Sequence, residues 1–322
     1  MQPPSPDTPL WIRYHRDFDG MVSGALLKRV LQDARGHRDL RLSSVNHDQR
    51  RDWEHFCVGL DFAIVDFHFH PRATYWFDHH PTTFLSPSDR AAYQPSDFWA
   101  WDERSPSCPP LILRHAEERF GYRAPAHFDE AARWSDVIDT AGFASVDQAL
   151  FAEDPALRLM RALAAAPSPN WTDELAEALV QRDLAELCRR ADVERAYAIA
   201  ARNRDQALRQ FPGTVLSMFG HVCHYDATSD RVRRERFAAF YHHPKALYSV
   251  GVIPTRAGFH VTAGENPWNK PDPGVHIGEL MTRYGGGGHH GVGGVNPDGL
   301  ESARRIAREV AEHLRRELGA IA

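Results

Sequence analysis

Cysteine is scarce in this sequence, with four residues in 322. They stand singly, and no two have the spacing of a zinc site or a redox motif. So few cysteines exclude a disulfide-stabilised scaffold and favour a reducing compartment. We therefore predict a cytoplasmic protein.

Positive charge and long apolar runs are also lacking. The 38 lysines and arginines are fewer than the 43 acids, which gives a net charge of −5. Proteins that bind long duplex nucleic acid usually carry the opposite excess, so we expect no such partner. No apolar run reaches the roughly 18 residues of a membrane span, and the first residues lack the basic and apolar regions of a signal peptide. We expect no association with membranes.

In the first half, short apolar segments alternate with segments of helical spacing. The patterns predict strands over 10–15, 62–67 and 73–77, and helices over 21–36 and 105–121. Proline near the start and glycine at the end support the second helix. Strands that alternate with helices predict an α/β fold with a mostly parallel sheet and flanking helices.

The pattern changes in the second half. Residues 172–210 contain no glycine or proline and are rich in Ala, Leu, Glu and Arg, which predicts one long helix or two abutting helices. Three strand-like segments and an amphipathic helix follow, at 214–220, 246–254, 258–264 and 301–318. The turn after the second of these strands predicts a hairpin. We predict two α/β domains, over 1–171 and 211–322, joined by a helical connector over 172–210.

Acids and histidines gather where the strands of the first domain end. The groups are His15, Asp17 and Asp19 after the first strand, Asp66 after the second, Asp78, His79 and His80 after the third, and Asp136 and Asp139 on a later segment. Ligands of open parallel sheets bind beyond the carboxyl ends of the strands, so neighbouring strands would bring these groups into one crevice. Taken singly, each group also suits helix capping, a turn or solvated charge.

Crowded carboxylates repel one another and raise one another's pKa unless a cation lies between them. A set with both imidazole and carboxylate ligands suits manganese, iron, cobalt or zinc. There are enough ligands for two divalent ions, as in two-metal hydrolases that clamp a phosphate. The sequence therefore predicts a dinuclear metal site in the first domain.

Four of these segments, in this order, resemble the motifs of the DHH phosphoesterase superfamily. They are HRDFDG (15–20), IVDF (64–67), FDHH (77–80) and WSDVID (134–139). The segment RYGGGGHHGVGG (283–294) resembles the GGGH loop of the DHH-associated C-terminal domain. The resemblance covers most of the chain. It points to the branch of RecJ-like exonucleases and of nanoRNA and cyclic-dinucleotide phosphodiesterases.

The resemblance implies a role for each residue of the set. His15 and Asp17 would bind one ion. Asp19, His79 and Asp136 would bind the other, and Asp66 would bridge the two ions. Asp78 would support His79, and His80 would face the scissile phosphate. The fourth motif leaves a choice, because Asp139 could replace Asp136.

The resemblance also implies that the second domain binds the substrate. Gly286, Gly287, Gly288 and His289 would hold its phosphate or terminal nucleotide, since glycine lets the backbone approach a ligand closely.

Three features outside the family pattern have a structural and a functional interpretation each. The basic run 231–236 is a solvated helix face or a docking site for distal phosphates. Trp268 packs a loop or stacks on a base. His68 and His70 are expected on the surface or in support of the metal ligands.

The sequence thus predicts a manganese-dependent phosphodiesterase that acts by two-metal activation of water. The expected substrates are short oligonucleotides, linear dinucleotides or 3′-phosphorylated nucleotides. Iron, cobalt, magnesium and zinc are alternatives to manganese. A hydrolase of phosphoanhydrides such as polyphosphate is a second hypothesis, and a nucleotide-binding sensor without catalysis is a third. The sequence leaves open whether the protein forms a homodimer.

Overall fold

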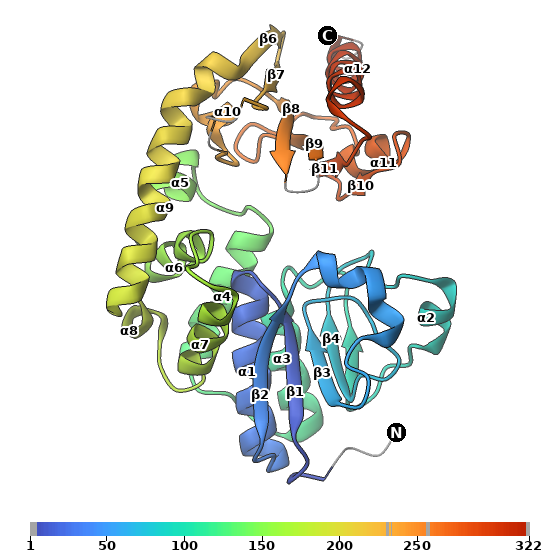
Figure 1. Cartoon of the computed structure of the whole chain (residues 1–322), viewed down its shortest axis with the longest axis vertical. Coiled ribbons are helices and arrows are strands. Elements are labelled where there is room, and N and C mark those ends of the chain that lie inside the picture. Colours follow the sequence, from blue (N-terminus) through green and yellow to red (C-terminus); the bar gives the residue numbers. More distant parts are fainter. Residues whose placement is uncertain (1–4, 230–231, 233, 256–257, 320–322) are drawn as a thin grey trace. The chain divides into compact units, whose positions relative to one another are not determined.

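The structure is a computed structural model that describes residues 5–229, 232, 234–255 and 258–319. The chain forms two compact units (Figure 1). The first comprises Met1–Gly142 and Glu153–Ala200, and the second comprises Phe143–Ala152 and Ala201–Ala322. This division differs from the predicted domains, because the second unit takes a short segment from the middle of the chain. Among the described residues, no helix has the length and apolar character that crossing a membrane requires.

The first unit is built on a five-stranded sheet of order β2-β1-β3-β4-β5. The strands are β1 (Leu10–His15), β2 (Leu40–Val45), β3 (Asp61–Val65), β4 (Tyr75–Asp78) and β5 (Trp99–Trp101). Every neighbouring pair runs parallel, which confirms the predicted α/β class. The carboxyl ends of β1, β3 and β4 therefore lie side by side at one edge.

Helices cover one face of this sheet. They are α1 (Phe18–Arg35), α3 (Cys108–Phe120) and α7 (Pro169–Leu179), and α4 (His127–Asp139) and α6 (Pro155–Leu163) pack against α1. α1 lies at their centre and contacts β1, α3, α4 and α7. It ends at Gly36, as predicted, where a φ of 71° suits glycine. The other face carries a cluster of buried aromatic side chains that includes Trp53 of the 3₁₀ segment His47–His55, Phe69 and Trp76, and the short helix α2 (Pro87–Ala92) has no buried residue.

The region predicted as one long helix or two is divided into three helices. α7 is followed by α8 (Leu184–Cys188) and α9 (Ala191–Gln210). The break before α8 has a local cause, because the Asp183 carboxylate accepts from the Glu186 N–H while the Glu186 side chain accepts from the Asp183 N–H. α7 and α8 belong to the core of the first unit, where Leu175 and Leu187 are fully buried.

The second unit contains a six-stranded mixed sheet of order β10-β11-β9-β8-β7-β6. The strands are β6 (Val215–Phe219), β7 (Val222–Asp226), β8 (Tyr248–Thr255), β9 (Gly258–Glu265), β10 (Gly287–Gly288) and β11 (Val292–Val295). β8 and β9 pair antiparallel as predicted, although the turn residues 256 and 257 lie outside the described residues. The helices are α5 (Val146–Phe151), α10 (Ala238–His242), α11 (Ile277–Thr282) and α12 (Leu300–Gly319). α12 buries Ile306, Val310 and Leu314 against the sheet, as its spacing predicted.

Candidate metal centre

The turn between β1 and α1 serves both as a helix cap and as part of the site. Asp17 is the N-cap of α1, and its Oδ1 accepts a hydrogen bond of 2.9 Å from the Gly20 N–H. Its other oxygen, Oδ2, lies 2.8 Å from Nδ1 of His15. A Cβ at Gly20 would lie 2.0 Å from the His15 carbonyl oxygen, so only glycine fits here. The capping interpretation and the metal interpretation of Asp17 are therefore compatible.

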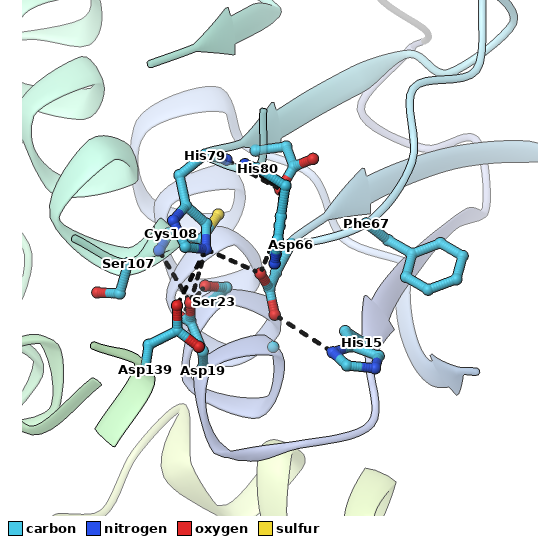
Figure 2. A network of polar contacts seen from close by, with 12 residues as sticks. His15, Asp19, Ser23, Asp66, Phe67, His79, His80, Ser107, Cys108 and Asp139 are labelled. Carbon is cyan, nitrogen blue, oxygen red and sulfur yellow. Dashed lines mark hydrogen bonds and ion pairs between the residues drawn. The ribbon is translucent and has the colours of Figure 1, made fainter. Parts of the chain in front are cut away.

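Asp66 follows β3 directly and lies between two histidines. Its backbone has a φ of 53°, a left-handed conformation that aspartate tolerates better than most residues. One carboxylate oxygen lies 3.8 Å from Nδ1 of His15, and the other lies 3.5 Å from Nε2 of His79. Figure 2 shows Asp66 in this central place. Asp66 thus lies between His15 and His79, and its role as a bridge stays a prediction.

His79, at the end of β4, points one ring nitrogen at three carboxylates. Its Nδ1 lies 3.2 Å from the Ser105 carbonyl oxygen, a contact that makes Nδ1 the donor. Its Nε2 lies 3.4 Å from Oδ2 of Asp19 and 3.6 Å from Oδ2 of Asp139. Together with the contact to Asp66, these distances place Nε2 at the centre of an acidic cluster (Figure 2).

The structure brings Asp139, and not Asp136, into this cluster. Both carboxylates lie on α4, one turn apart. Asp136 accepts a hydrogen bond of 2.6 Å from the Ser107 hydroxyl and belongs to none of the ligand groups among the described residues. Burial, with the charge of Asp19, raises the pKa of Asp139 to about 6. Of the two alternatives in the fourth motif, the geometry favours Asp139.

Asp78 contacts both histidines of the DHH segment. Its Oδ1 accepts a hydrogen bond of 2.9 Å from the backbone N–H of His79. The same oxygen lies 2.8 Å from Nδ1 of His80. Asp78 was predicted to support His79; its carboxylate in fact reaches the backbone of His79 and the ring of His80.

Several buried polar atoms of the site have no hydrogen-bond partner within the part of the chain that the structure describes. They are both carboxylate oxygens of Asp66, Oδ2 of Asp78 and Nε2 of His79. Burial of such atoms without a partner is costly. The ligand atoms lie within 4.8 Å of one another inside each of three groups, namely His15, Asp17 and Asp66; Asp19, His79 and Asp139; and Asp66, Asp78, His79 and His80. Unsatisfied acceptors and a mixed imidazole and carboxylate set fit divalent cations.

The pKa values of Asp66, His79 and His80 indicate which groups of the site are protonated when no cation is bound. Burial, with the charges of Asp19 and Asp17, raises the pKa of Asp66 well above its usual range. Burial alone would lower the pKa of His79, but the neighbouring carboxylates raise it to about 9. Burial would also lower the pKa of His80, and the charge of Asp78 raises it to about 10. Protons thus compensate the acids in the metal-free protein.

His68 and His70 lie outside these ligand groups. Nδ1 of His68 lies 3.3 Å from the Thr83 carbonyl oxygen. His70 is buried among aromatic rings, and its Nε2 lies 3.1 Å from the Trp53 carbonyl oxygen. Both rings contact Trp53 of the aromatic cluster on one face of the sheet.

The glycine loop of the second unit forms part of a hairpin, since β10 pairs with β11. A Cβ at Gly286 would lie 2.2 Å from the Gly294 carbonyl oxygen, and one at Gly288 would lie 2.3 Å from the Val292 carbonyl oxygen. A Cβ at Gly287 would meet nothing within 4 Å. Close packing therefore explains two of these glycines, and the role of the loop in substrate binding stays a prediction.

The two remaining candidates also lie in the second unit. Nε1 of Trp268 donates a hydrogen bond of 2.7 Å to the Phe143 carbonyl oxygen, and its ring packs against Phe237. These contacts favour loop packing for Trp268. Two arginines of the basic run, at 231 and 233, lie outside the described residues.

The sequence matches no protein-family model and no curated protein sequence. The structure, however, is similar to solved structures. A pGpG-specific phosphodiesterase of Vibrio cholerae superimposes with a TM-score of 0.69 at 19% identity, over 96% of this chain and 99% of that one. RecJ of Thermus thermophilus, in complex with Mn²⁺, gives 0.55 at 13% identity, over 96% of this chain and 52% of RecJ.

A third structure carries the family name. The DHH domain of a protein assigned to a family of ribosomal proteins gives a TM-score of 0.56 at 12% identity, over 95% of this chain and 86% of that one. At these identities the likeness shows the fold. The chain shares its fold with these three structures, one of which is a DHH domain, and this agrees with the fold that the sequence resemblance implied.

Proposed function

We propose that the protein is a metal-dependent phosphodiesterase that cleaves small phosphodiesters. The observation that carries the proposal is the partly buried cluster in which Asp66 and His79, themselves buried, each belong to two ligand groups. Its unpaired acceptor atoms suit two divalent ions, of which manganese is our first choice. We place one ion at His15, Asp17 and Asp66, and the other at Asp19, His79, Asp139 and Asp66.

The chain contributes orientation and charge to this chemistry. Bound divalent ions would acidify a water and offset negative charge on the phosphoryl oxygens. The Ser105 carbonyl fixes the ring of His79 so that Nε2 faces the carboxylates. Asp78 holds the ring of His80, whose raised pKa keeps it cationic at neutral pH in the metal-free protein. We propose that His80 faces the scissile phosphate and donates a proton to the leaving oxygen.

For the substrate we propose a linear dinucleotide or a short oligonucleotide. The similar Vibrio cholerae structure is described as a pGpG-specific phosphodiesterase, and its chain is covered almost completely. The net charge of −5 argues against a broad basic surface that would bind a long duplex. We propose that the glycine loop at 286–288 and His289 bind the part of the substrate away from the scissile bond.

The test is an assay of the purified protein with manganese. The panel contains 5′-phosphorylated di- to pentanucleotides, a 3′-phosphorylated mononucleotide and polyphosphate. We expect mononucleotide release from the dinucleotide. Phosphate release from polyphosphate alone would instead favour the phosphoanhydride hypothesis, and no product from any member would reject both.

A pair of aspartate variants shows whether the observed activity belongs to this site. Asp66→Asn removes the shared carboxylate charge and should lower the rate by more than about 100-fold. Asp39→Asn changes an acid at the opposite end of the strands, which is 39% exposed and pairs with Arg41. Asp39→Asn should keep the wild-type rate. Equal rates for the two variants would assign the activity to a contaminant.

A further inference from the structure

The first turn of α3 has fewer backbone N–H donors than the first turn of most helices. Ser107 is the N-cap, and Cys108, Pro109 and Pro110 are the first three helical residues. A serine at this position normally accepts from the N–H of the second or third helical residue. Both of those residues are prolines here and have no N–H. The Ser107 hydroxyl makes no cap and donates to Asp136.

The remaining N–H of this turn points at a carboxylate of the metal centre. The backbone N–H of Cys108 donates a hydrogen bond of 3.0 Å to Oδ2 of Asp19. Oδ2 is also the oxygen that lies 3.4 Å from Nε2 of His79. Asp19 is only 2% exposed, so this contact is shielded from water. The positive end of the α3 dipole adds to the attraction.

The same short segment reaches a second ligand. The Ser105 carbonyl accepts from Nδ1 of His79, and the Ser105 hydroxyl donates 2.8 Å to the Ser107 carbonyl, which braces the turn. Segment 105–108 thus contacts both Asp19 and His79 through backbone atoms. Figure 2 shows Cys108 beside these two residues. The other ligand group, with His15, is built instead from the β1–α1 turn and the end of β3.

We infer that segment 105–108 is a positioning element for one of the two ions, and that the Cys108 N–H is its main device. This rests on the proposed function, since it presumes that Asp19, His79 and Asp139 bind a cation. A hydrogen bond to one lone pair of Asp19 orients the carboxylate and leaves its remaining lone pairs for the ion. Loss of the donor weakens this ion's site and spares the site at His15 and Asp17.

The N–H can be removed in two ways, of which proline also puts a ring carbon in place of the hydrogen that faces Asp19. Proline is well tolerated at the first helical position, and Ser107 has φ −152° and ψ 174°, an extended conformation that a following proline accepts. Cys108→Pro therefore deletes the donor together with the sulfur. Cys108→Ala deletes the sulfur and keeps the donor, which makes it the matched comparison. The α-hydroxy acid counterpart of alanine at position 108 removes the donor without a proline ring.

The experiment is a titration of each full-length protein with Mn²⁺, followed by calorimetry and by the electron paramagnetic resonance signal of free Mn²⁺. Wild type and Cys108→Ala should each bind two ions with affinities within about twofold. Cys108→Pro and the α-hydroxy acid variant should lose about 10- to 100-fold in affinity for one ion only. Their dinucleotide hydrolysis should recover as manganese is raised. Every variant should keep a cooperative thermal unfolding transition in EDTA, which separates positioning from a loss of folding.

The outcomes distinguish this inference from the proposed function. Wild-type protein that binds no divalent ion would overturn both. Two ions in wild type, with unchanged affinities in both donor-deletion variants, would overturn the positioning role alone. Equal weakening of both ions would show that the segment supports the whole centre and would reject the selectivity that we infer.

Discussion

Asp136 and Asp139 occupy one face of α4 with different partners. Asp139 lies 3.6 Å from Nε2 of His79, whereas Asp136 is engaged by the Ser107 hydroxyl. Asp136 accepts the hydrogen bond of Ser107, and its carboxylate lies outside the ligand groups of the described residues. From this contrast we propose a direct role for the carboxylate at 139 and a supporting one for the carboxylate at 136.

Substitution of the two aspartates by asparagine tests this assignment. Asp139→Asn should weaken manganese binding by about 10- to 100-fold or more, because it neutralises a carboxylate of the ligand group. Asp136→Asn keeps an acceptor for Ser107 and should change the affinity by less than about threefold. Manganese titration of both variants gives the comparison. A larger loss for Asp136→Asn would return the fourth-motif role to that residue.

The protonation state of the metal-free site predicts how stability depends on pH. The folded-state pKa of His79 is about 9, above the value of 6.5 for an unfolded histidine. Its contribution to stability is thus fully present below pH 6.5 and is lost as pH rises through about 9. The pKa of His80 is raised in the same sense. Metal-free protein should therefore unfold at a lower temperature at pH 9.5 than at pH 6.5.

Thermal unfolding in EDTA and in manganese measures this effect. Saturating manganese should reduce or reverse the fall with pH, because metal binding displaces the protons. His79→Gln should show a smaller fall than wild type in EDTA. A melting temperature of the metal-free protein that rises from pH 6.5 to 9.5 would contradict this charge state.

For single residues, the sequence predicts well which side chains of the site lie near one another. It predicts less well which of them are in direct contact. His15, Asp66 and His79 each stand at or just after a strand end, and parallel pairing of β1, β3 and β4 was enough to bring them together. The choice between Asp136 and Asp139 depends on which of two turns of α4 faces His79, and the sequence around both is equally acidic. The contact of Asp78 with His80 depends on the course of the chain after β4, for which no sequence rule exists.

Among the elements, the hairpin β10–β11 combines tight packing with a proposed substrate role. Gly288 has a φ of 149°, and a Cβ there would lie 2.3 Å from the Val292 carbonyl oxygen. Gly287, its neighbour, has open space around its Cα. A substitution at Gly288 therefore tests the packing of the fold, whereas a substitution at Gly287 tests the binding of a ligand.

Alanine at each position gives the test. Gly288→Ala should destabilise the second unit by more than about 1 kcal/mol, because an L residue is strained at this φ. Gly287→Ala should change stability by less than about 0.5 kcal/mol. If the loop binds the substrate as proposed, Gly287→Ala should raise KM and leave kcat close to wild type. Denaturant unfolding and steady-state kinetics provide the two measurements, and an unaffected KM would count against the substrate role of the loop.

The elements that the sequence missed have specific physical causes. β2 reads LRLSSV, and only Leu40 and Val45, at its ends, are buried, so it lacks the apolar run of its neighbours. The break before α8 comes from a capping box in a segment that is rich in helix formers throughout. By contrast, α1, α3 and α12 were predictable because each carries an apolar stripe.

The whole molecule consists of two units, each of which is built from two separate segments of the chain. All ligand groups among the described residues belong to the first unit. The segment Phe143–Ala152 belongs to the second, where Phe143 packs against Phe237 and accepts the hydrogen bond of Trp268. No local pattern in the sequence indicates that Phe143–Ala152 belongs to the second unit, because the residues that Phe143 contacts lie about a hundred residues further along the chain.

This arrangement predicts two unfolding transitions that respond to different changes. Manganese at 100 times its Kd should stabilise the first unit by about 2.7 kcal/mol and leave the second unchanged. Phe143→Ala should destabilise the second unit by about 3–5 kcal/mol, since Phe143 is only 5% exposed, and leave the manganese-dependent transition in place. Calorimetry with and without EDTA resolves the two transitions. A single transition that shifts with both manganese and Phe143→Ala would mean that the units unfold together, because α9 runs through both and would then transmit the loss of one to the other.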